Sequence, residues 1–400
     1  MSPSVLRSQN AAILYGARDL RVEQRTLWPP QEGHVQIDVR ATGLCGSDLH
    51  YYLHGRNGDF ALQAPLVLGH EAAGVITALG PSSPSSSTHG FHVGQRVAIE
   101  AGIKCGECSY CTKGRYNLCK NMRFASSAKT YPHLDGTLQE RMNHPASCIH
   151  PLPDNVSFEQ AALAEPLSVL IHASRRAGLS QSTPAAQLPT SMIVLGVGAI
   201  GLLACAVART YGIARVCAID INAARLDFAR AHGFADAVFC LPPPAGEKPK
   251  TADEQLKRAK DAADAALRAF GLSEDGGADV VYECTGAEPC IQQSVFLAAA
   301  GARVLLIGMG TRQTVLPLSA AATREVDVLG SFRYADTYPE ALALLAQPGS
   351  FVRAHALELV SHRFALADAK RAFELLAKGR DETGAMVLKV VVTPDGAEAQ

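Results

Sequence analysis

The sequence predicts a two-domain α/β protein, in which a β-rich domain accompanies a doubly wound parallel sheet. The chain of 400 residues is long enough to form two separate hydrophobic cores. Apolar and polar residues alternate with period two near its start, as in half-buried antiparallel strands. In the second half, short apolar runs alternate with helical patterns, which is typical of a parallel sheet.

The composition excludes several classes of partner. The chain carries 37 Lys and Arg residues against 38 Asp and Glu residues, without a block of like charge. This balance argues against nucleic acid and anionic membranes, and it favours a small, roughly neutral partner. Met1–Asn10 lacks the basic and apolar segments of a secretory signal, and no apolar run is long enough to span a membrane. We therefore expect a soluble, cytoplasmic protein.

The first strands are predicted within Ala11–Arg40, where alternating runs are separated by Gly and Pro. Cys45 follows in a Gly-rich loop, and the motif Gly69-His70-Glu71 comes later in the chain. Thiolate, imidazole and carboxylate are good zinc ligands, and three protein ligands leave one coordination position open for chemistry. Cys45, His70 and Glu71 are therefore candidate ligands of a catalytic zinc.

A cysteine-rich lobe is predicted after the Pro/Ser-rich loop Pro81–Gly90 and a further strand. Its four cysteines follow the pattern C-x2-C-x2-C-x7-C. Four thiolates in a short segment can close a tetrahedron around zinc, which suits a structural metal. The alternative of unrelated buried cysteines fits less well, because cysteine is sparse elsewhere. The expected structural ligands are Cys105, Cys108, Cys111 and Cys119.

A helix over Ala161–Arg176 is expected to lead out of the first domain. Glu165 lies near its start, where an acidic side chain interacting with the helix dipole is the simpler explanation of its presence.

A dinucleotide-binding unit follows, with a buried strand at Ser191–Leu195, a glycine loop, an apolar helix and a second strand. Gly196 allows the tight turn, Gly198 lets the backbone approach the pyrophosphate, and Gly201 lets the helix pack closely.

Asp220 determines the expected cofactor. It ends the second strand of this unit, and its carboxylate can accept hydrogen bonds from ribose hydroxyls and repel a 2′-phosphate. Arg225 weakens the argument slightly, because its guanidinium could contact a phosphate. We expect NAD rather than NADP.

The remaining elements complete the two domains. A solvated crossover helix is expected within Leu241–Gly277, followed by buried strands whose carboxyl ends border the nicotinamide half of the cofactor. The last strand, Met386–Val392, should return to the sheet of the first domain, and Pro394–Gln400 should form a loose tail. We thus expect a catalytic domain at 1–168 and 332–400 and an NAD-binding domain at 169–331.

With these motifs the sequence resembles the zinc-containing medium-chain dehydrogenases, and most closely their polyol dehydrogenases for sorbitol and xylitol. The resemblance covers about residues 12–392 and implies a GroES-like catalytic domain and a Rossmann domain. It rests on the motifs above and on local strings such as Glu165-Pro166-Leu167-Ser168-Val169 and Phe332-Arg333-Tyr334. It also implies a homo-oligomer, either a dimer or a tetramer.

The resemblance implies roles for individual residues. Cys45, His70 and Glu71 would hold the catalytic zinc with water as fourth ligand, and Glu165 would hold or replace that water. Polyol contacts would come from Tyr51, Glu165, Arg333 and Tyr334, with Phe60 at an aromatic pocket position where L-arabinitol enzymes tend to have Met. Cofactor contacts would come from Ile200, Asp220, Arg225, Ile307, Gly308, Met309, Ser331, Phe332 and Arg333.

The expected reaction is oxidation of a secondary hydroxyl of sorbitol or xylitol to a ketose, with zinc polarising the hydroxyl and NAD accepting hydride. Glu165 would accept the proton or hold water. Ser47 and His50 are candidates for carrying the proton outward, although such a histidine is more often structural. Ordinary packing between the domains is the alternative explanation for Tyr51 and Tyr334.

Two competing functions stay open at this level. A zinc-free reductase or a non-catalytic protein of the same superfold would keep the glycine loop without needing Cys45, His70 or Glu71. A dehydrogenase for L-arabinitol, butanediol or threonine would keep the glycine loop and the three zinc ligands. Only Phe60 and the polyol-contact positions argue against it.

Overall fold

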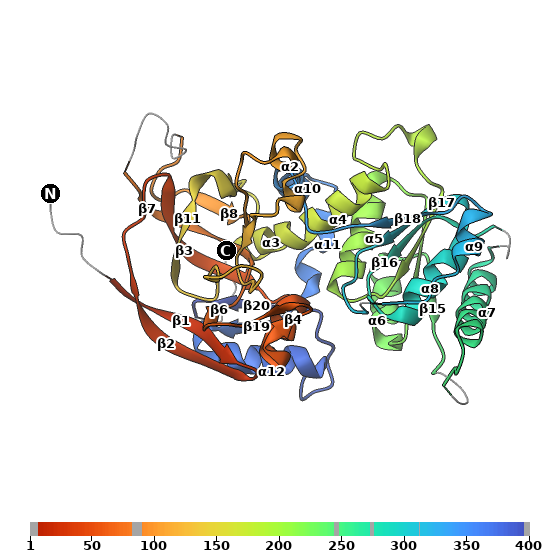
Figure 1. The fold of residues 1–400 in the computed structure, drawn as a ribbon. Coiled ribbons are helices and arrows are strands. Elements are labelled where there is room, and N and C mark those ends of the chain that lie inside the picture. Colours follow the sequence, from red (N-terminus) through yellow and green to blue (C-terminus); the bar gives the residue numbers. More distant parts are fainter. Residues whose placement is uncertain (1–6, 82–89, 244–247, 273–275, 312, 396–400) are drawn as a thin grey trace. The chain divides into compact units, whose positions relative to one another are not determined.

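The computed structural model describes residues 7–81, 90–243, 248–272, 276–311 and 313–395. The chain divides into two compact units (Figure 1). The first, here called the β-rich unit, comprises Met1–Ser168, Ala335–Pro348 and Ala356–Gln400, and the parallel-sheet unit comprises Val169–Tyr334 and Gly349–His355. Within the described ranges, no helix is both long enough and apolar enough to cross a membrane.

A seven-stranded sheet forms the centre of the β-rich unit, with the strand order β12-β8-β7-β3-β20-β19 and with β11 also paired to β3. Its strands are β3 (His34–Gly43), β7 (Glu71–Leu79), β8 (Arg96–Ile99), β11 (Arg141–Pro145), β12 (Ile149–Pro151), β19 (Val360–Ala365) and β20 (Lys389–Thr393). The C-terminal strand β20 pairs with β3, Val391 lying opposite Gly43. This confirms the prediction that the last strand returns to the first sheet.

A smaller sheet and several helices surround this centre. The smaller sheet has the order β2-β1-β6. Its strands are β1 (Arg7–Gly16), β2 (Asp19–Leu27) and β6 (Leu66–Val67). Two further two-stranded sheets pair β4 (Arg56–Asn57) with β5 (Phe60–Ala61) and β9 (Gly102–Ile103) with β10 (Arg123–Phe124). The helices are α1 (Gly46–His54), α2 (Ser109–Thr112), α3 (Phe158–Ala162), α10 (Tyr338–Ala346) and α12 (Ala369–Lys378), with 3-10 turns at Tyr116–Leu118, Ala146–Cys148, Leu357–Leu359 and Leu366–Asp368.

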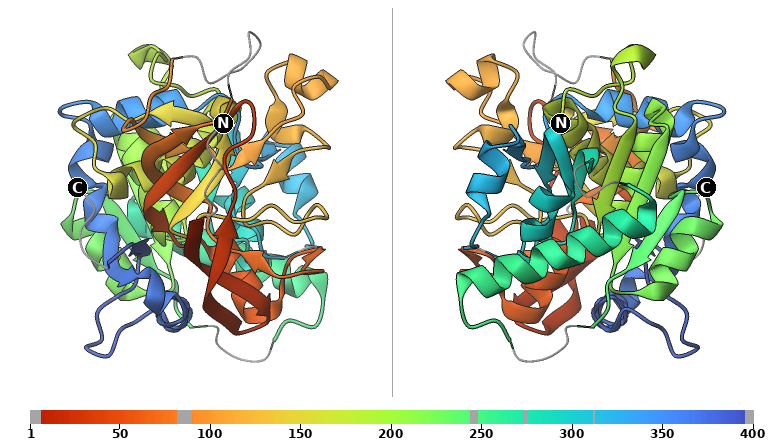
Figure 2. Two further views of the ribbon diagram at one scale, coloured as in Figure 1. Left: turned by 90° about the vertical axis from the view of Figure 1, so that its left-hand side faces the viewer. Right: turned by 90° about the vertical axis from the view of Figure 1, so that its right-hand side faces the viewer.

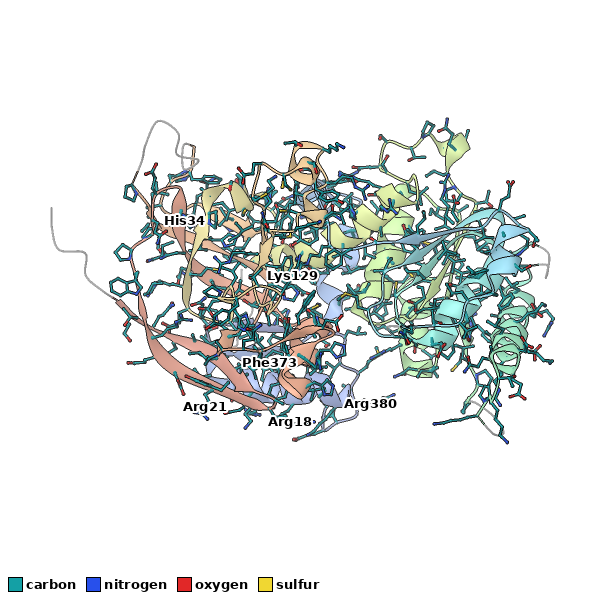
Figure 3. All side chains as sticks on the ribbon, viewed as in Figure 1. Arg18, Arg21, His34, Lys129, Phe373 and Arg380 are labelled. Carbon is teal, nitrogen blue, oxygen red and sulfur yellow. The ribbon has the colours of Figure 1, made fainter. Side chains whose placement is uncertain are left out.

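Two apolar clusters hold the β-rich unit together. One lies within the seven-stranded sheet and includes Val35, Ile37 and Ile76. The other joins β1, α1, α12 and β20 and contains Phe373, which Figure 3 labels. The ring of Phe373 stacks on that of Tyr52, with centroids 5.1 Å apart. Burial of such large rings contributes strongly to stability, so α1 is fixed on the sheet where the candidate metal ligands begin.

The parallel-sheet unit contains six parallel strands in the order β15-β14-β13-β16-β17-β18. Counted along the chain this is 3-2-1-4-5-6, the order of a doubly wound dinucleotide-binding fold, and it confirms the predicted fold class. The strands are β13 (Ser191–Leu195), β14 (Arg215–Asp220), β15 (Ala237–Cys240), β16 (Ala278–Glu283), β17 (Ala298–Leu306) and β18 (Asp327–Gly330).

Helices cover the parallel sheet. Ala263, Ala266 and Leu267 of the long helix α7 pack into the same apolar cluster as strand residues, and Figure 2 shows α7 lying across the sheet. The helices of this unit are α5 (Ala199–Tyr211), α6 (Ala223–Ala231), α7 (Ala252–Phe270), α8 (Glu288–Leu297), α9 (Leu318–Ala322) and α11 (Phe351–His355), with a 3-10 turn at Ala185–Gln187.

The predicted helix Ala161–Arg176 is in fact two helices, α3 and α4 (Ala164–Arg176). Ser157 caps the first, because its hydroxyl accepts a hydrogen bond from the Gln160 amide. Pro166 lies in the first turn of α4, where its missing N–H leaves no helical bond unmade. Parts of three other predicted segments, the loop Pro81–Gly90, the crossover Leu241–Gly277 and the tail Pro394–Gln400, lie outside the described residues.

Candidate active site

Cys45, His70 and Glu71 meet in the β-rich unit. Cys45 is the N-cap of α1, Glu71 begins β7, and His70 immediately precedes it. One ligand atom from each residue lies within 4.8 Å of the others. A thiolate, an imidazole and a carboxylate at this separation fit one zinc ion and leave a fourth position for another ligand.

Two glycines permit this close approach. Gly43 lies opposite Glu71 in the pairing of β3 with β7, and a Cβ on Gly43 would overlap Oε2 of the Glu71 carboxylate. Gly69 has a φ of 93°, which other residues rarely adopt, and a Cβ there would lie 2.8 Å from Oγ1 of Thr137. The backbone on both sides of the site is therefore restricted to glycine.

Asp48 orients the imidazole. Its Oδ1 accepts a hydrogen bond from Nδ1 of His70 at 3.2 Å, and it also accepts bonds from the Ser126 hydroxyl and the Gly69 amide. Its Oδ2 accepts the backbone N–H of Cys45. With Nδ1 engaged in this way, Nε2 of His70 is the nitrogen available to a metal, and the carboxylate raises its basicity.

The opposite charges of Asp48 and His70 shift the pKa values of both groups. Burial would raise the pKa of Asp48, but the charge of His70 and the hydrogen bonds of Asp48 lower it below its usual value. Burial would likewise lower the pKa of His70, but the negative charges of Asp48 and Cys45 raise it well above its ordinary value. The negative charges of Asp48 and Cys45 thus favour a positive charge at His70.

Glu71 also has a cationic partner that the sequence reasoning missed. Nζ of Lys389, on β20, lies 2.8 Å from Oε1 and 2.7 Å from Oε2 of Glu71. Burial would lower the pKa of Lys389, but Glu71 and Cys45 raise it. A signal did exist, because a lone lysine inside an otherwise apolar strand is rarely buried without a partner. Asp48 was missed because nothing in its sequence context marks its side chain as buried.

The remaining predicted residues of the β-rich unit have different positions. Glu165 begins α4 and is buried, but it is not part of the group of ligand atoms formed by Cys45, His70 and Glu71. The Ser47 hydroxyl lies 3.5 Å from Nε2 of His70. His50 is exposed on α1, and its ring stacks on that of His54 at a centroid distance of 6.1 Å.

The predicted polyol contacts Tyr51 and Phe60 border the apolar core of this unit. Tyr51 is only 1% exposed, and its phenol oxygen accepts the Ala128 amide at 2.9 Å. Phe60 is half-buried on β5 and packs against the same cluster. Tyr51 therefore has a structural role in the core, and a polyol contact by it stays a prediction.

The four lobe cysteines form a second candidate metal site. Their ligand atoms all lie within 4.8 Å of one another, with Sγ of Cys108 3.5 Å from Sγ of Cys111. Backbone N–H groups of Cys108 and Glu107 lower the pKa of Cys105 to about 6, which favours its thiolate. Four converging thiols with no other ligand suit a closed, structural zinc. The group consists of Cys105, Cys108, Cys111 and Cys119.

The glycine loop of the parallel-sheet unit joins β13 to α5. Gly198 is the N-cap of α5, so the amides of the first helical turn face outward. Gly196 has a φ of 85°, and a Cβ on it would lie 2.5 Å from Thr285. A Cβ on Gly201 would overlap the carbonyl of Gly196. Ile200 lies between them in the first turn, and the geometry fits the backbone cradle that a pyrophosphate requires.

Asp220 lies beside this loop at the end of β14. Its Oδ2 accepts the Val197 amide and its Oδ1 accepts the Asn222 amide, both at 2.8 Å. The carboxylate is thus fixed next to the loop while its oxygens keep further lone pairs for a ligand. Arg225 reaches the same place, because its Nη1 would lie 3.9 Å from a Cβ on Gly198.

The segments that follow β16 and β17 lie in close contact at the same edge of the parallel sheet. The amides of Ile307 and Gly308 both donate to the Glu283 carbonyl, and a Cβ on Gly308 would overlap the backbone of Gly286. Met309 follows and is 62% exposed. Ser331, Phe332, Arg333 and Tyr334 follow β18, with the Arg333 guanidinium 5.0 Å from the centroid of the Phe332 ring.

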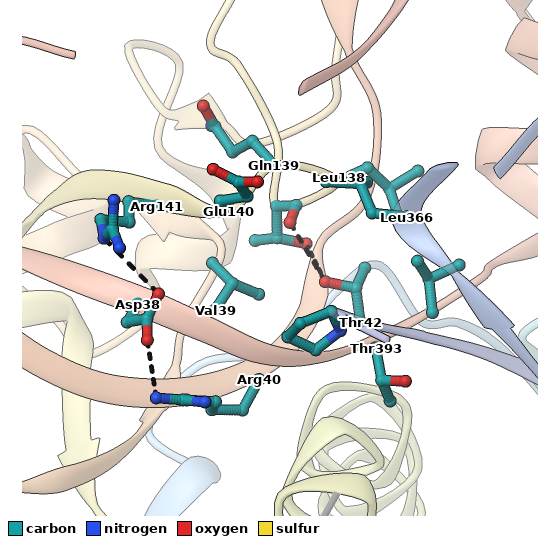
Figure 4. A pocket seen from close by; sticks show the side chains of 13 residues that line it. Asp38, Val39, Arg40, Thr42, Leu138, Gln139, Glu140, Arg141, Leu366 and Thr393 are labelled. Atoms are coloured by element: carbon teal, nitrogen blue, oxygen red, sulfur yellow. Dashed lines mark hydrogen bonds and ion pairs between the residues drawn. The ribbon is translucent and has the colours of Figure 1, made fainter. Parts of the chain in front are cut away.

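A separate cavity in the β-rich unit contains none of the candidate ligands. It has a volume of about 250 Å³ and is lined by Asp38, Arg40, Thr42 and Arg141 among others (Figure 4). Asp38 pairs with both arginines at its rim, and Thr42 donates to Thr137 in its wall. Because these polar groups form ion pairs and hydrogen bonds with one another, they give no indication that the cavity binds a ligand.

Comparisons with known proteins agree with this geometry. The family model "Alcohol dehydrogenase GroES-like domain" matches residues 31–154, and "Zinc-binding dehydrogenase" matches residues 199–347. The chain is 37% identical over 383 residues to the sorbitol dehydrogenase of Bos taurus, covering 96% of this chain and 95% of that protein. It is also 37% identical to a probable D-xylulose reductase A of Aspergillus fumigatus, covering 95% and 97%. The crystal structure of L-idonate 5-dehydrogenase from Escherichia coli covers 98% of this chain and all 100% of its own, with a TM-score of 0.78 and 27% identity.

Proposed function

Because the chain belongs to the family of zinc-containing medium-chain dehydrogenases, we propose that it oxidises a secondary hydroxyl of an acyclic polyol, sorbitol or xylitol, to a ketose with NAD. The family expected from the sequence is thereby confirmed. The zinc-free alternative loses its support, since the family is zinc-binding and the chain carries a full donor set.

The observation that supports this reaction most directly is the group formed by Cys45, His70 and Glu71. Zinc held there would supply Lewis-acid catalysis, lowering the pKa of a hydroxyl brought to the open position. The protein's own contribution is to fix the donors. Asp48 keeps Nε2 of His70 directed at the metal position. Gly43 and Gly69 leave room for the Glu71 carboxylate and for the backbone beside it.

The proton released from the substrate hydroxyl needs an acceptor. We assign this role to Glu165, as proton acceptor or as holder of a water molecule, because it lies on the first turn of α4 and contributes to the field at Lys389. Ser47 is a candidate for passing the proton outward, since its hydroxyl lies 3.5 Å from Nε2 of His70. His50, exposed on the same helix, would complete the path to solvent.

The hydride acceptor is NAD, bound at the carboxyl edge of the parallel sheet. The carboxylate of Asp220, fixed by two backbone amides, supports recognition of the ribose hydroxyls. Gly196, Gly198, Ile200 and Gly201 would form the pyrophosphate cradle, with Arg225 beside it. The nicotinamide half would contact Ile307, Gly308, Met309, Ser331, Phe332 and Arg333.

Polyol recognition is assigned to side chains that bear hydroxyls or positive charge. Arg333 and Tyr334 would hydrogen-bond the substrate hydroxyls, with Tyr51 contributing its phenol and Phe60 shaping the pocket. We also propose a homo-oligomer, a dimer or a tetramer, working in the cytoplasm. All 11 cysteines of the chain are free in the structure, in keeping with a reducing compartment.

The test is an NAD-reduction assay across sorbitol, xylitol, L-arabinitol, 2,3-butanediol and threonine at matched concentrations. We expect the highest kcat/KM with sorbitol or xylitol. A clear preference for L-arabinitol would assign that activity instead, and activity only with butanediol or threonine would overturn the polyol proposal. Replacing Cys45 with Ser should abolish turnover of every substrate, because the thiolate ligand is lost.

A further inference from the structure

Lys389 lies in direct contact with a proposed metal ligand. Its Nζ donates to both carboxylate oxygens of Glu71 and, at 3.2 Å, to the carbonyl of Leu44, the residue before Cys45. An ammonium group has three donors, and these three bonds use all of them. Lys389 is 3% exposed and Glu71 is 0% exposed, so water does not screen the pair.

Stability alone does not explain this pair. β20 is buried along its whole length, and Lys389 begins a strand otherwise made of Val and Thr. A buried ion pair is often no more stabilising than apolar residues of the same volume, because desolvation offsets the attraction. A cation placed against a metal-ligand carboxylate instead alters how strongly that carboxylate can bind a metal.

We propose that Lys389 is a positioning residue that competes with the catalytic metal for Glu71. It holds the Glu71 carboxylate in place in the metal-free protein, and it keeps Glu71 a weak, shared ligand when the metal is bound. Each carboxylate oxygen has two lone-pair directions, so sharing with Lys389 still leaves one on each oxygen for the metal. The inference rests on the metal ligands assigned under the proposed function.

Two opposing effects decide what happens when Lys389 is removed. Loss of an outer-shell contact usually weakens metal binding by about 10- to 100-fold. Repulsion between an ammonium and a divalent cation a few ångströms apart, at an effective dielectric constant of about 20, is a larger effect of opposite sign. Packing of Glu71 against Gly43 also persists without the lysine. Removing Lys389 should therefore tighten metal binding.

The test is a double-mutant cycle with Lys389→Met, Glu71→Gln and the double variant, using the full chain. Zinc affinity is measured by competition with a chromophoric chelator, and the zinc of the four-cysteine lobe serves as internal reference. We expect Lys389→Met to bind the second zinc at least about tenfold tighter. We also expect Glu71→Gln to weaken zinc binding more when it is combined with Lys389→Met than when it is made in the parent.

Opposite results would overturn the inference. If Lys389→Met weakens zinc binding and the effect of Glu71→Gln disappears in that background, Lys389 orients Glu71 for the metal rather than competing with it. Equal effects of Glu71→Gln in both backgrounds would show that the two residues act independently. The double variant carries no buried charge at these positions, so it keeps the cycle interpretable if Lys389→Met folds poorly. Lys389→Gln, which removes the charge but keeps a donor, is the second single variant and should also tighten zinc binding.

A matched control comes from the neighbouring strand. Arg363 on β19 donates to both oxygens of the buried Glu159, at 2.8 and 2.7 Å, outside the metal-ligand group. Arg363→Met should lower stability without changing zinc affinity, whereas Lys389→Arg should restore the parent affinity. Cobalt substitution gives a spectroscopic check, because Lys389→Met should shift the ligand-field bands and Arg363→Met should not.

The experiment also separates this inference from the assignment of the metal ligands. If Cys45→Ser still retains two zinc ions per chain, the assigned catalytic site itself is wrong. If Cys45→Ser loses one zinc while the Lys389 variants bind zinc as the parent does, the site stands and the competition by Lys389 is wrong.

Discussion

Asp48 connects four parts of the candidate metal site through a single carboxylate. It receives hydrogen bonds from the imidazole of His70, the hydroxyl of Ser126 and the amides of Cys45 and Gly69. The carboxylate is fully buried, so each of these bonds lies in a medium of low polarity. Its position fixes both the metal-ligating tautomer of the histidine and the loop that carries the thiol.

We expect Asp48→Asn to weaken metal retention by about 10- to 100-fold, because the imidazole loses its charged partner. Zinc content after dialysis against a chelator, together with kcat, measures the effect. Ser126→Ala is the control, since it removes one bond to the same carboxylate but leaves that of His70. Equal zinc retention in Asp48→Asn and Ser126→Ala would contradict the orienting role.

His144 on β11 makes stability depend on pH. Burial and the charge of His34 lower its pKa to about 4, against the opposing effects of the Glu100 carboxylate and of the hydrogen bond that its Nε2 donates to the Glu100 carbonyl at 2.9 Å. In the unfolded chain the pKa is about 6.5, so between these values the unfolded state binds a proton that the folded state does not. Stability should therefore fall as pH is lowered through this window, by about 3 kcal/mol from this residue.

Urea unfolding at pH 7 and pH 4.5 measures this contribution. His144→Gln keeps a donor for the carbonyl without a titrating group, so it should lose about 2 to 3 kcal/mol less than the parent over this interval. The same pH dependence in both proteins would show that the loss arises at other residues.

The residues of the site differ in how far the sequence could predict them. Cys45, His70 and Glu71 were proposed as ligands because their types and motif context indicate zinc chemistry, and the structure brings one ligand atom from each within 4.8 Å of the others. Asp48 was missed because nothing in its sequence context marks its side chain as buried. A lysine in an otherwise apolar strand signals a buried partner, but no local pattern identifies Glu71 as that partner, because the contact depends on β20 pairing with β3.

At the scale of elements, the Tyr116 side chain links the cysteine lobe to the segment just before α10. The Tyr116 hydroxyl donates to Oε1 of the buried Glu100 at 2.7 Å and accepts the amide of Asp336 at 2.8 Å, just before α10 begins. The two clusters given above include no described residue from 105–119, so such polar links help to position the lobe.

Tyr116→Phe should destabilise the protein by about 1 to 3 kcal/mol, because a buried carboxylate oxygen and an amide lose this partner. Urea unfolding at pH 7 provides the measurement. Tyr110→Phe, a change at a 39% exposed tyrosine of the same lobe, should change stability by less than about 0.5 kcal/mol. Similar losses in the two variants would argue against the link.

Element predictions succeeded where one pattern determined the structure. The glycine loop and its flanking strands were predicted correctly, since tight turn, helix start and buried strand all follow from residues 191–220. The helix Ala161–Arg176 was predicted as one element because its apolar spacing continues through the break at Leu163.

For the whole molecule, we expect cofactor choice to depend on Asp220. Asp220→Ser should raise kcat/KM with NADP and lower it with NAD, because the charge that repels a 2′-phosphate is removed. The ratio of the two kcat/KM values measures the change independently of any loss of stability. Asp236→Ser is the control, since Asp236 also accepts a backbone amide of this sheet and should leave the ratio unchanged. An unaltered ratio in Asp220→Ser would count against a ribose role.

The two units also differed in how predictable their topology was. Parallel strands joined by crossover helices have few allowed orders, so the alternation of elements was enough to predict a doubly wound parallel sheet, and the structure gives its strand order. In the β-rich unit, β3 pairs with β7, β11 and β20, which come from widely separated parts of the chain. Nothing in the residues of β3 specifies these neighbours.

The contact between Lys389 and Glu71 has a consequence for biosynthesis. The two residues are 318 positions apart, and ribosomes add about 5 to 20 residues per second, so roughly 16 to 64 seconds separate their synthesis. Throughout that interval Glu71 lacks the Lys389 ammonium that opposes its charge in the folded protein, and β3 lacks its neighbour β20. The buried ion pair is therefore completed late in translation, and a nascent chain that closes β7 against β3 early leaves this carboxylate without its ammonium partner until β20 arrives.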